Sequence, residues 1–275
     1  MNTTNSNNES SPTEGTIQVA DIKMGYRIYG NGFPLILISG YGSTMELWEP
    51  GTINALAAHY QVIIFDNRGI GQTEKGTKAF SIEQFSEDSC GLMDALGIKQ
   101  AHVMGWSMGG MIAQELALQH PDRIGKLILY GAHCGASMFP PRPEIIQMLT
   151  DLSGTPRERG MRYLGVLFSG EWMQNNGMRI GQIFGRPMGN IPEDTISQQS
   201  EAIEAWPGSA DRLSGMRFPV LLISGADDNL VIAKNLEFMS SKIPNAQLEL
   251  VENSGHGLMF QFPELFCEKV LDFLK

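Results

Sequence analysis

Short apolar runs alternate with longer segments of helical periodicity along most of this chain. The apolar runs lie at residues 35–38, 62–65, 102–104, 127–130, 220–223 and 248–251. Runs this apolar are typical of strands buried on both faces of a parallel sheet. The helical patterns between them span residues 48–59, 81–96, 108–120, 233–243 and 264–274. This alternation predicts an α/β fold in which helices flank a mostly parallel sheet.

Two further runs near the N-terminus, at residues 17–20 and 26–29, are short and close together. They indicate an antiparallel pair at one edge of the sheet, which brings the total to about eight strands. Residues 1–15 consist mostly of Asn, Ser, Thr and Glu, and they lack the basic and apolar regions of a secretory signal. We expect these first residues to form a disordered tail.

The alternation stops between residues 130 and 220. From residue 140 to residue 206 the pattern is that of several short helices interrupted by Gly and Pro. This segment is too short and too helical for a second α/β domain, so we expect a helical cap over the carboxyl ends of the strands. The predicted organisation is one core, residues 16–135 and 211–275, with a cap at residues 136–210 inserted after the sixth strand.

A Gly-Trp-Ser-Met-Gly sequence at residues 105–109 joins an apolar strand to a helical pattern. This spacing fits the sharp strand-to-helix turn that presents a nucleophilic serine above a sheet. Gly105 and Gly109 leave room beside Ser107, where Cβ atoms would collide. The alternative is a glycine turn that only packs, as in dinucleotide-binding folds, but the spacing is not G-x-G-x-x-G and the strand is the fifth in order. We interpret Ser107 as a nucleophile.

A serine nucleophile needs a histidine as its base and a carboxylate that orients this histidine. His256 lies in a glycine-containing loop between the last predicted strand and the final helix, from which the imidazole can reach across the sheet. The preceding strand is followed by two adjacent acids, Asp227 and Asp228. Each could supply the carboxylate, while the other would be a turn residue that bonds its own backbone.

Several linked motifs resemble those of the α/β-hydrolase superfamily, in the same order. They are Ser-Gly-Tyr-Gly at 39–42, Asp-Asn-Arg-Gly-Ile-Gly-Gln-Thr at 66–73, Gly-Trp-Ser-Met-Gly-Gly at 105–110, Gly-Ala-Asp-Asp at 225–228 and Gly-His at 255–256. The layout is similar to that of carboxylesterases, enol-lactone hydrolases and cofactor-free haloperoxidase-like members. The resemblance implies the α/β-hydrolase fold and the order Ser107, acid, His256. Its Gly-x-x-Asp pattern, counted from Gly225, selects Asp228 as the acid.

A hydrolase of this kind also needs backbone donors aimed at the oxyanion. We expect the N–H groups of Met108 and Tyr41 to form this oxyanion hole, because Gly40 and Gly42 allow the Tyr41 N–H to turn inward. The alternative is that residues 39–42 form only a glycine-rich turn.

The chain departs from the family pattern at two positions outside the predicted triad. Ser39 and Ile70 stand where the family usually has histidine. The departure at Ser39 concerns the second predicted oxyanion donor, the Tyr41 N–H, because Ser39 lies in the same Ser-Gly-Tyr-Gly segment. In the segment around Ile70, Asp66 and Arg68 are expected to form a buried structural pair.

The predicted cap is rich in methionine and aromatic residues, which either line an adaptable apolar pocket or attach short helices to the core. Its arginines either hold a substrate carboxylate or form a solvated face. Cys90, Cys134 and Cys267 are too widely spaced for a zinc site, and reduced thiols are expected. Cys134 follows a strand and would be placed near a pocket.

These features together predict two-step acyl transfer on a small, largely apolar ester or lactone, with no metal or organic cofactor. C–C bond hydrolysis, amide or peptide cleavage and perhydrolase chemistry would use the same triad, and a non-catalytic ligand receptor is the alternative from another class. A net charge of −10 gives no support for binding to nucleic acid or to a membrane surface. We expect a soluble cytoplasmic protein, either a monomer or a homodimer.

Overall fold

The computed structural model describes residues 11–135 and 138–275, and it has one eight-stranded sheet. The strands are β1 (Thr13–Val19), β2 (Ile22–Tyr29), β3 (Pro34–Ile38), β4 (Gln61–Phe65), β5 (Ala101–Trp106), β6 (Ile124–Tyr130), β7 (Val220–Gly225) and β8 (Ala246–Val251). Their order is β1-β2-β4-β3-β5-β6-β7-β8. The β1–β2 and β2–β4 pairs are antiparallel and the other pairs are parallel. The predicted sheet is confirmed.

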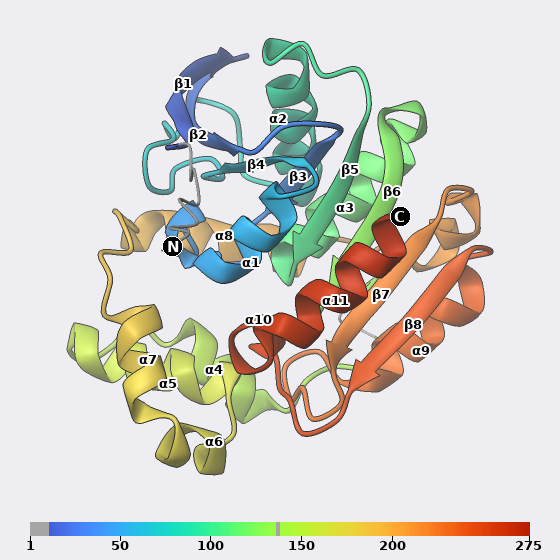
Figure 1. The fold of residues 1–275 in the computed structure, drawn as a ribbon. Helices are drawn as coiled ribbons and strands as arrows, with labels where there is room; N and C mark the ends of the chain where they lie inside the picture. The colour runs from blue at the N-terminus through green and yellow to red at the C-terminus, as the bar shows by residue number, and fades with distance from the viewer. Residues whose placement is uncertain (1–10, 136–137) are drawn as a thin grey trace, which may run out of the picture.

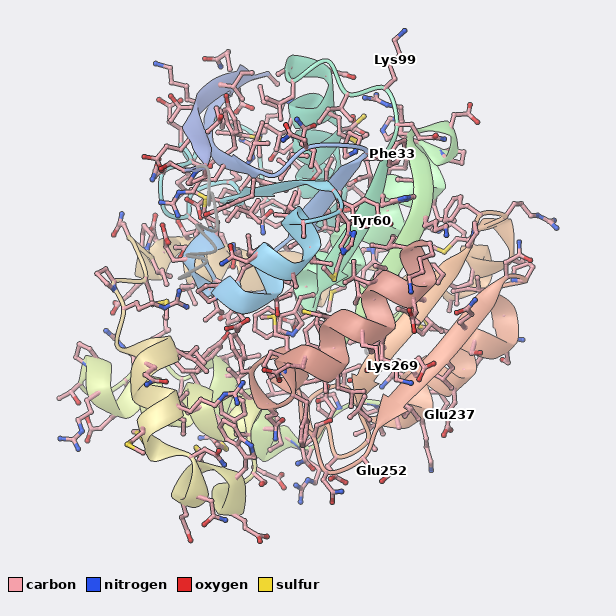
Figure 2. All side chains as sticks on the ribbon, in the orientation of Figure 1. Phe33, Tyr60, Lys99, Glu237, Glu252 and Lys269 are labelled. Atoms are coloured by element: carbon pink, nitrogen blue, oxygen red, sulfur yellow. The ribbon has the colours of Figure 1, made fainter. Side chains whose placement is uncertain are left out.

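Helices cover both faces of the sheet (Figure 1). One face carries α2 (Ile82–Ala95), α3 (Met108–Gln119) and α9 (Ala233–Lys242), and the other carries α1 (Pro50–Ala57), α10 (Leu258–Gln261) and α11 (Pro263–Leu274). Side chains alternate along each strand, so that Ile36 and Ile38 pack on the first face while Leu35 and Leu37 pack on the second. Figure 2 shows the charged side chain of Lys99 on the outside of this layered core, where it is exposed.

Among the described residues, five α-helices lie between β6 and β7, in the stretch where the cap is predicted. They are α4 (Pro143–Thr150), α5 (Pro156–Leu167), α6 (Gly170–Asn175), α7 (Gly177–Phe184) and α8 (Glu193–Ala205). Figure 1 shows α4 to α7 beyond the ends toward which β5, β7 and β8 point. Within the described residues, no helix is long and apolar enough to cross a membrane.

The C-terminal part of this helical segment is attached to the core by hydrogen bonds. Thr44 Oγ1 donates to the Met188 carbonyl over 2.6 Å, and the Gly71 N–H donates to the Asn190 carbonyl over 2.8 Å. The Gly42 N–H donates to Gln199 Oε1 over 2.9 Å. Residues 188–200 therefore hold the loops that follow β3 and β4 in place.

Two details differ from the sequence-based expectations. Strand β1 begins at Thr13, inside the range expected to be a tail, because residues 13–15 pair with β2; residues 1–10 lie outside the described part of the chain. Arg68 does not pair with Asp66, whose carboxylate accepts from the N–H groups of Met45 and Gln72. The fully buried Arg68 pairs instead with Asp21 and with Asp88, at 2.9 and 2.7 Å.

Removal of the Asp88 charge should destabilise the fold, because the buried Arg68 guanidinium then loses one of its two carboxylate partners. We expect Asp88→Asn to lower the free energy of unfolding by about 3 kcal/mol, measured by urea denaturation. Glu14→Gln is the matched control, since Glu14 is 63% exposed in its pair with Arg27, and a loss of at most about 0.5 kcal/mol is expected there. Equal losses in the two variants would contradict this account.

Candidate active site

Ser107 lies on a strained turn between the end of β5 and the start of α3. Its backbone has φ 56° and ψ −120°, a conformation that side-chain-bearing residues rarely adopt. A Cβ atom at Gly105 would overlap the Gly109 carbonyl, and one at Gly109 would overlap the Ile38 carbonyl. The turn is fixed by a 2.9 Å hydrogen bond from the Ser107 N–H to the Tyr130 carbonyl. Backbone strain of this kind is concentrated at functional sites.

His256 and Asp228 form a buried hydrogen-bonded pair near the ends of β8 and β7. His256 Nδ1 lies 2.7 Å from Asp228 Oδ2, and the two side chains are 3% and 0% exposed. The other carboxylate oxygen accepts from the N–H groups of Leu230 and Val231, at 2.9 and 2.8 Å. Ser224 Oγ adds a 3.0 Å bond to Oδ2. These donors fix the carboxylate so that it orients the imidazole.

Asp227 takes no part in this pair. It is exposed, its N–H donates to the Ser254 carbonyl over 2.9 Å, and its own carbonyl accepts from Asn229. The structure thus brings Asp228 to His256 and leaves Asp227 as a turn residue.

Ser107 and His256 line the same small space of about 10 Å³. Gly40 contacts this site as well, since a Cβ atom on it would lie 3.2 Å from the Ser107 Cβ. Within the described residues, no hydrogen bond joins the serine hydroxyl to the imidazole. Such bonds are often long in a free enzyme and tighten when substrate binds.

Tyr41 and Met108, whose N–H groups are predicted to bind the oxyanion, both lie beside Ser107. Met108 is the first residue of α3, where the helix provides no acceptor for its N–H. Tyr41 also lines the space beside Ser107, and its side chain is held by a 2.8 Å hydrogen bond between its hydroxyl and Ser200 Oγ. Ser39, which stands where the family usually has histidine, is buried, and its hydroxyl has no partner within the described residues.

Sequence reasoning missed the residues that support His256 from β6. The fully buried Tyr130 hydroxyl donates to the His256 carbonyl over 2.8 Å and accepts from the Met259 N–H over 3.1 Å. Gly131 has φ 51°, and a Cβ atom on it would lie 3.1 Å from the imidazole. An apolar strand that ends in Tyr-Gly carries no signal for either contact.

His133 and Cys134 are buried near the site in uncharged forms. Burial, with a smaller effect from His256, lowers the pKa of His133 to about 4, and its Nδ1 accepts from the Gly135 N–H over 3.1 Å. Burial raises the pKa of the Cys134 thiol to about 11, so this group is not a thiolate at neutral pH. Within the described residues, no three His, Cys, Asp or Glu side chains are grouped as metal ligands would be.

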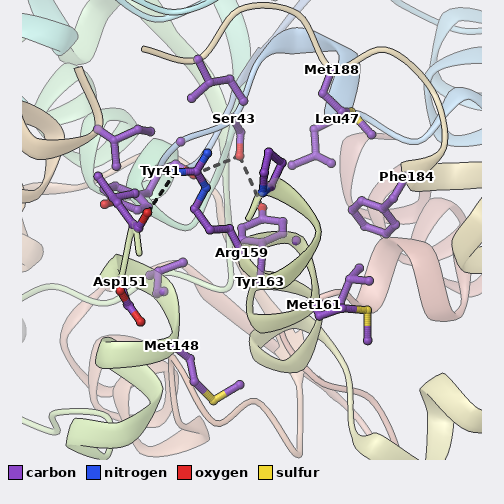
Figure 3. Close-up of a pocket in the computed structure, with 18 of the residues that line it drawn as sticks. Tyr41, Ser43, Leu47, Met148, Asp151, Arg159, Met161, Tyr163, Phe184 and Met188 are labelled. Atoms are coloured by element: carbon purple, nitrogen blue, oxygen red, sulfur yellow. Dashed lines mark hydrogen bonds between the residues drawn. The ribbon is translucent and has the colours of Figure 1, made fainter. Parts of the chain in front are cut away.

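A larger cavity of about 490 Å³ lies between the core loops and the helices α4, α5, α7 and α8 (Figure 3). Its lining is mainly apolar and includes Leu47, Met148, Leu149, Leu152, Met161, Tyr163, Leu164, Phe184, Met188, Ile191 and Ile196. Arg159, at its edge, is paired with Glu193 at 2.6 Å. Several methionines and aromatic residues of the predicted cap therefore line a cavity, which is one of the two alternatives that the sequence left open.

Comparison with known proteins identifies the family of this fold. The family model for the alpha/beta hydrolase fold matches residues 34–263. A protein of Azorhizobium caulinodans named "Putative carbamate hydrolase RutD" is 30% identical over 92% of this chain and 95% of its own length. The enol-lactonase from Burkholderia xenovorans LB400 is similar in structure, with a TM-score of 0.81 and 25% identity over 94% of this chain and 99% of that one.

An alpha/beta hydrolase fold protein from Chitinophaga pinensis is also similar, with a TM-score of 0.84 and 28% identity over 97% of this chain and 98% of that one. The fold and these similarities define a hydrolase. The chain belongs to the α/β-hydrolase family.

The buried, neutral His133 should cause the free energy of unfolding to fall in mild acid. Its folded pKa of about 4 lies below the unfolded value of 6.5, so the unfolded chain gains a proton first as the pH falls. Stability contributed by neutral His133 is present above pH 6.5 and is lost between pH 6.5 and 4, by up to about 3 kcal/mol. Measurements of the free energy of unfolding across this window should give a shallower pH dependence for His133→Gln. An identical slope in both proteins would contradict the assignment.

Proposed function

We propose that this hydrolase cleaves a carboxylic ester or lactone of a small, largely apolar substrate through an acyl-enzyme on Ser107. The observation that carries the proposal is the buried 2.7 Å pair of His256 and Asp228 in the space where Ser107 lies on its strained turn. A serine beside an oriented imidazole is the arrangement used for nucleophilic acyl transfer.

In the first half of the reaction, Ser107 Oγ attacks the carbonyl carbon and His256 Nε2 accepts its proton. Asp228 holds Nδ1–H, which leaves Nε2 free to act as the base, and it stabilises the imidazolium that forms. The N–H groups of Tyr41 and Met108 donate to the oxyanion of the tetrahedral intermediate. Collapse of this intermediate breaks the bond to the leaving oxygen, which takes the proton from His256.

In the second half, water attacks the acyl group on Ser107 while His256 again accepts a proton. Collapse of the second intermediate releases the carboxylic acid and restores the serine hydroxyl. For a lactone the leaving oxygen remains attached to the acyl group, so the product is a single hydroxy acid. The similarity to an enol-lactonase supports a lactone as one form of substrate.

A second candidate activity is carbamate cleavage by the same residues. The names of relatives that are 30% identical over most of this chain favour it. A carbamate carbonyl carries a nitrogen that donates electrons, so attack by the same serine is intrinsically slower. The two activities would use the same triad and would differ in the acyl group that is transferred to Ser107.

Ester and carbamate substrates with the same leaving group distinguish these candidates. We expect p-nitrophenyl acetate to be hydrolysed with a higher kcat/KM than p-nitrophenyl N-methylcarbamate, measured by release of p-nitrophenolate. Ser107→Ala should lower kcat by roughly 10⁶-fold with an unchanged circular dichroism spectrum. A preference for the carbamate would favour the second candidate, and full activity of Ser107→Ala would overturn the nucleophile.

The two adjacent acids offer a matched pair of variants. Asp228→Asn should lower kcat by about 10⁴-fold, because the amide cannot stabilise the imidazolium or hold the productive tautomer. Asp227→Asn changes an exposed turn residue and should leave kcat within about threefold of the parent. A larger loss at Asp227 than at Asp228 would show that the acid is wrongly assigned.

A further inference from the structure

The space beside Ser107 adjoins the large cavity, and we call the residues that line both of them the wall. The two spaces share four lining residues, which are Tyr41, Ser43, Leu149 and Tyr163. About 10 Å³ at the serine holds no more than about one water molecule. The outer cavity, at about 490 Å³, has the size of a typical small-molecule site. An acyl group on Ser107 that extends into the outer cavity therefore has to pass these four residues.

The core side of the wall is tethered. The Tyr41 hydroxyl is hydrogen-bonded to Ser200 at 2.8 Å, and the Tyr41 carbonyl accepts from Ser43 Oγ at 3.0 Å. The next residue, Gly42, donates its N–H to Gln199. Movement of Tyr41 would also displace the backbone N–H that is proposed to bind the oxyanion. The loop that carries Tyr41 and Ser43 is thus the fixed part of the wall.

The cap side of the wall is held by apolar packing and one long hydrogen bond. Leu149 comes from α4 and Tyr163 from α5, and Leu149 has an apolar side chain. Within the described residues, the Tyr163 hydroxyl has one polar contact, at 3.5 Å, with Ser43 Oγ. Figure 3 shows Ser43 between Tyr41 and Tyr163, with the Tyr163 ring facing the cavity. Rotation of this ring breaks one long hydrogen bond and leaves the Tyr41 loop intact.

We propose that Tyr163 is a specificity-determining residue, whose ring lies at the junction of the space beside Ser107 and the outer cavity and turns aside to admit a long acyl group. The proposal rests on the acyl-transfer function above and specifies its substrate. The non-reacting part of the substrate occupies the outer cavity and is largely apolar. Of the charged residues that line this cavity, Arg159 and Asp151 face the opposite charges of Glu193 and Arg162, and Arg157 is exposed to solvent.

Removal of the Tyr163 ring enlarges the opening between the two spaces, so the gain in kcat/KM should grow with the size of the acyl group. We expect Tyr163→Ala to raise the ratio of kcat/KM for p-nitrophenyl octanoate to that for p-nitrophenyl acetate by about tenfold. Tyr163→Phe keeps the ring and should leave the ratio within about twofold of the parent. Leu149→Ala opens the same wall from α4 and should shift the ratio in the same direction as Tyr163→Ala.

The matched control is Trp172→Ala, which removes a cap aromatic residue that stacks on Phe168 and lines neither space. Its ratio should stay within about twofold of the parent. An unchanged ratio in Leu149→Ala and in folded Tyr163→Ala would overturn the proposal, as would an equal shift in Tyr163→Phe or in Trp172→Ala. Loss of activity toward both esters in Tyr163→Ala would also overturn it.

Labelling by diisopropyl fluorophosphate separates this proposal from the function on which it rests. If Ser107 is labelled in the parent and in the Tyr163 variants but the chain-length ratio does not shift, only the role of Tyr163 fails. If Ser107 of the parent is not labelled and p-nitrophenyl acetate is not hydrolysed, the acyl-transfer function itself fails.

Discussion

The turn that carries Ser107 is the constraint on which the rest of the site depends. The chain must pass from the fifth strand into α3 within one residue, and it does so with a serine at φ 56°. Gly105 and Gly109 are required because backbone atoms of the turn and of β3 occupy the space that their Cβ atoms would need. Side-chain-bearing residues at such angles cost about 1–3 kcal/mol and persist only when the surroundings hold them. Here β5 lies between β3 and β6, so neighbouring strands supply this support from both sides.

Parallel pairing explains how distant segments meet at this turn. Strands β5 to β8 are adjacent and parallel, so the loops at their carboxyl ends converge at one edge of the sheet. Asp228 and His256 come from two of these loops, and Tyr130 and Gly131 at the end of β6 lie next to His256. The Tyr130 hydroxyl fixes the backbone of His256 while the absent side chain of Gly131 leaves room for the imidazole. The site is therefore assembled by the order of the strands.

The sequence predicts those parts of the molecule in which one local pattern decides the structure. Buried parallel strands are apolar throughout, and sharp turns need glycine, so the strands, the main helices and the position of Ser107 follow from the printed residues. The edge residues 13–15 were missed because backbone hydrogen bonds pair them with β2, and polar side chains at an exposed edge show no alternation. Arg68 was paired with the wrong acid because Asp88 and Asp21 lie on other elements, 20 and 47 residues away in the chain. Tyr130 was missed because its strand has the pattern of a core strand.

The helical cap has the weakest sequence pattern, and its side chains form most of the large cavity. Short helices broken by Gly and Pro have no fixed orientation that periodicity could reveal, so the sequence could not separate residues that line a cavity from residues that only pack. The structure divides them by contact: Phe168 and Trp172 stack on each other, whereas Met148, Tyr163 and Phe184 line the outer cavity. The core supplies the proposed reacting groups at strand ends, and the cap supplies most of the side chains that line the large cavity. Because residues 188–200 hold the loop of Tyr41 against the core, the cap can vary its α4 and α5 side chains without moving the groups proposed to bind the oxyanion. Substrate choice and acyl-transfer chemistry can thus change independently on this fold.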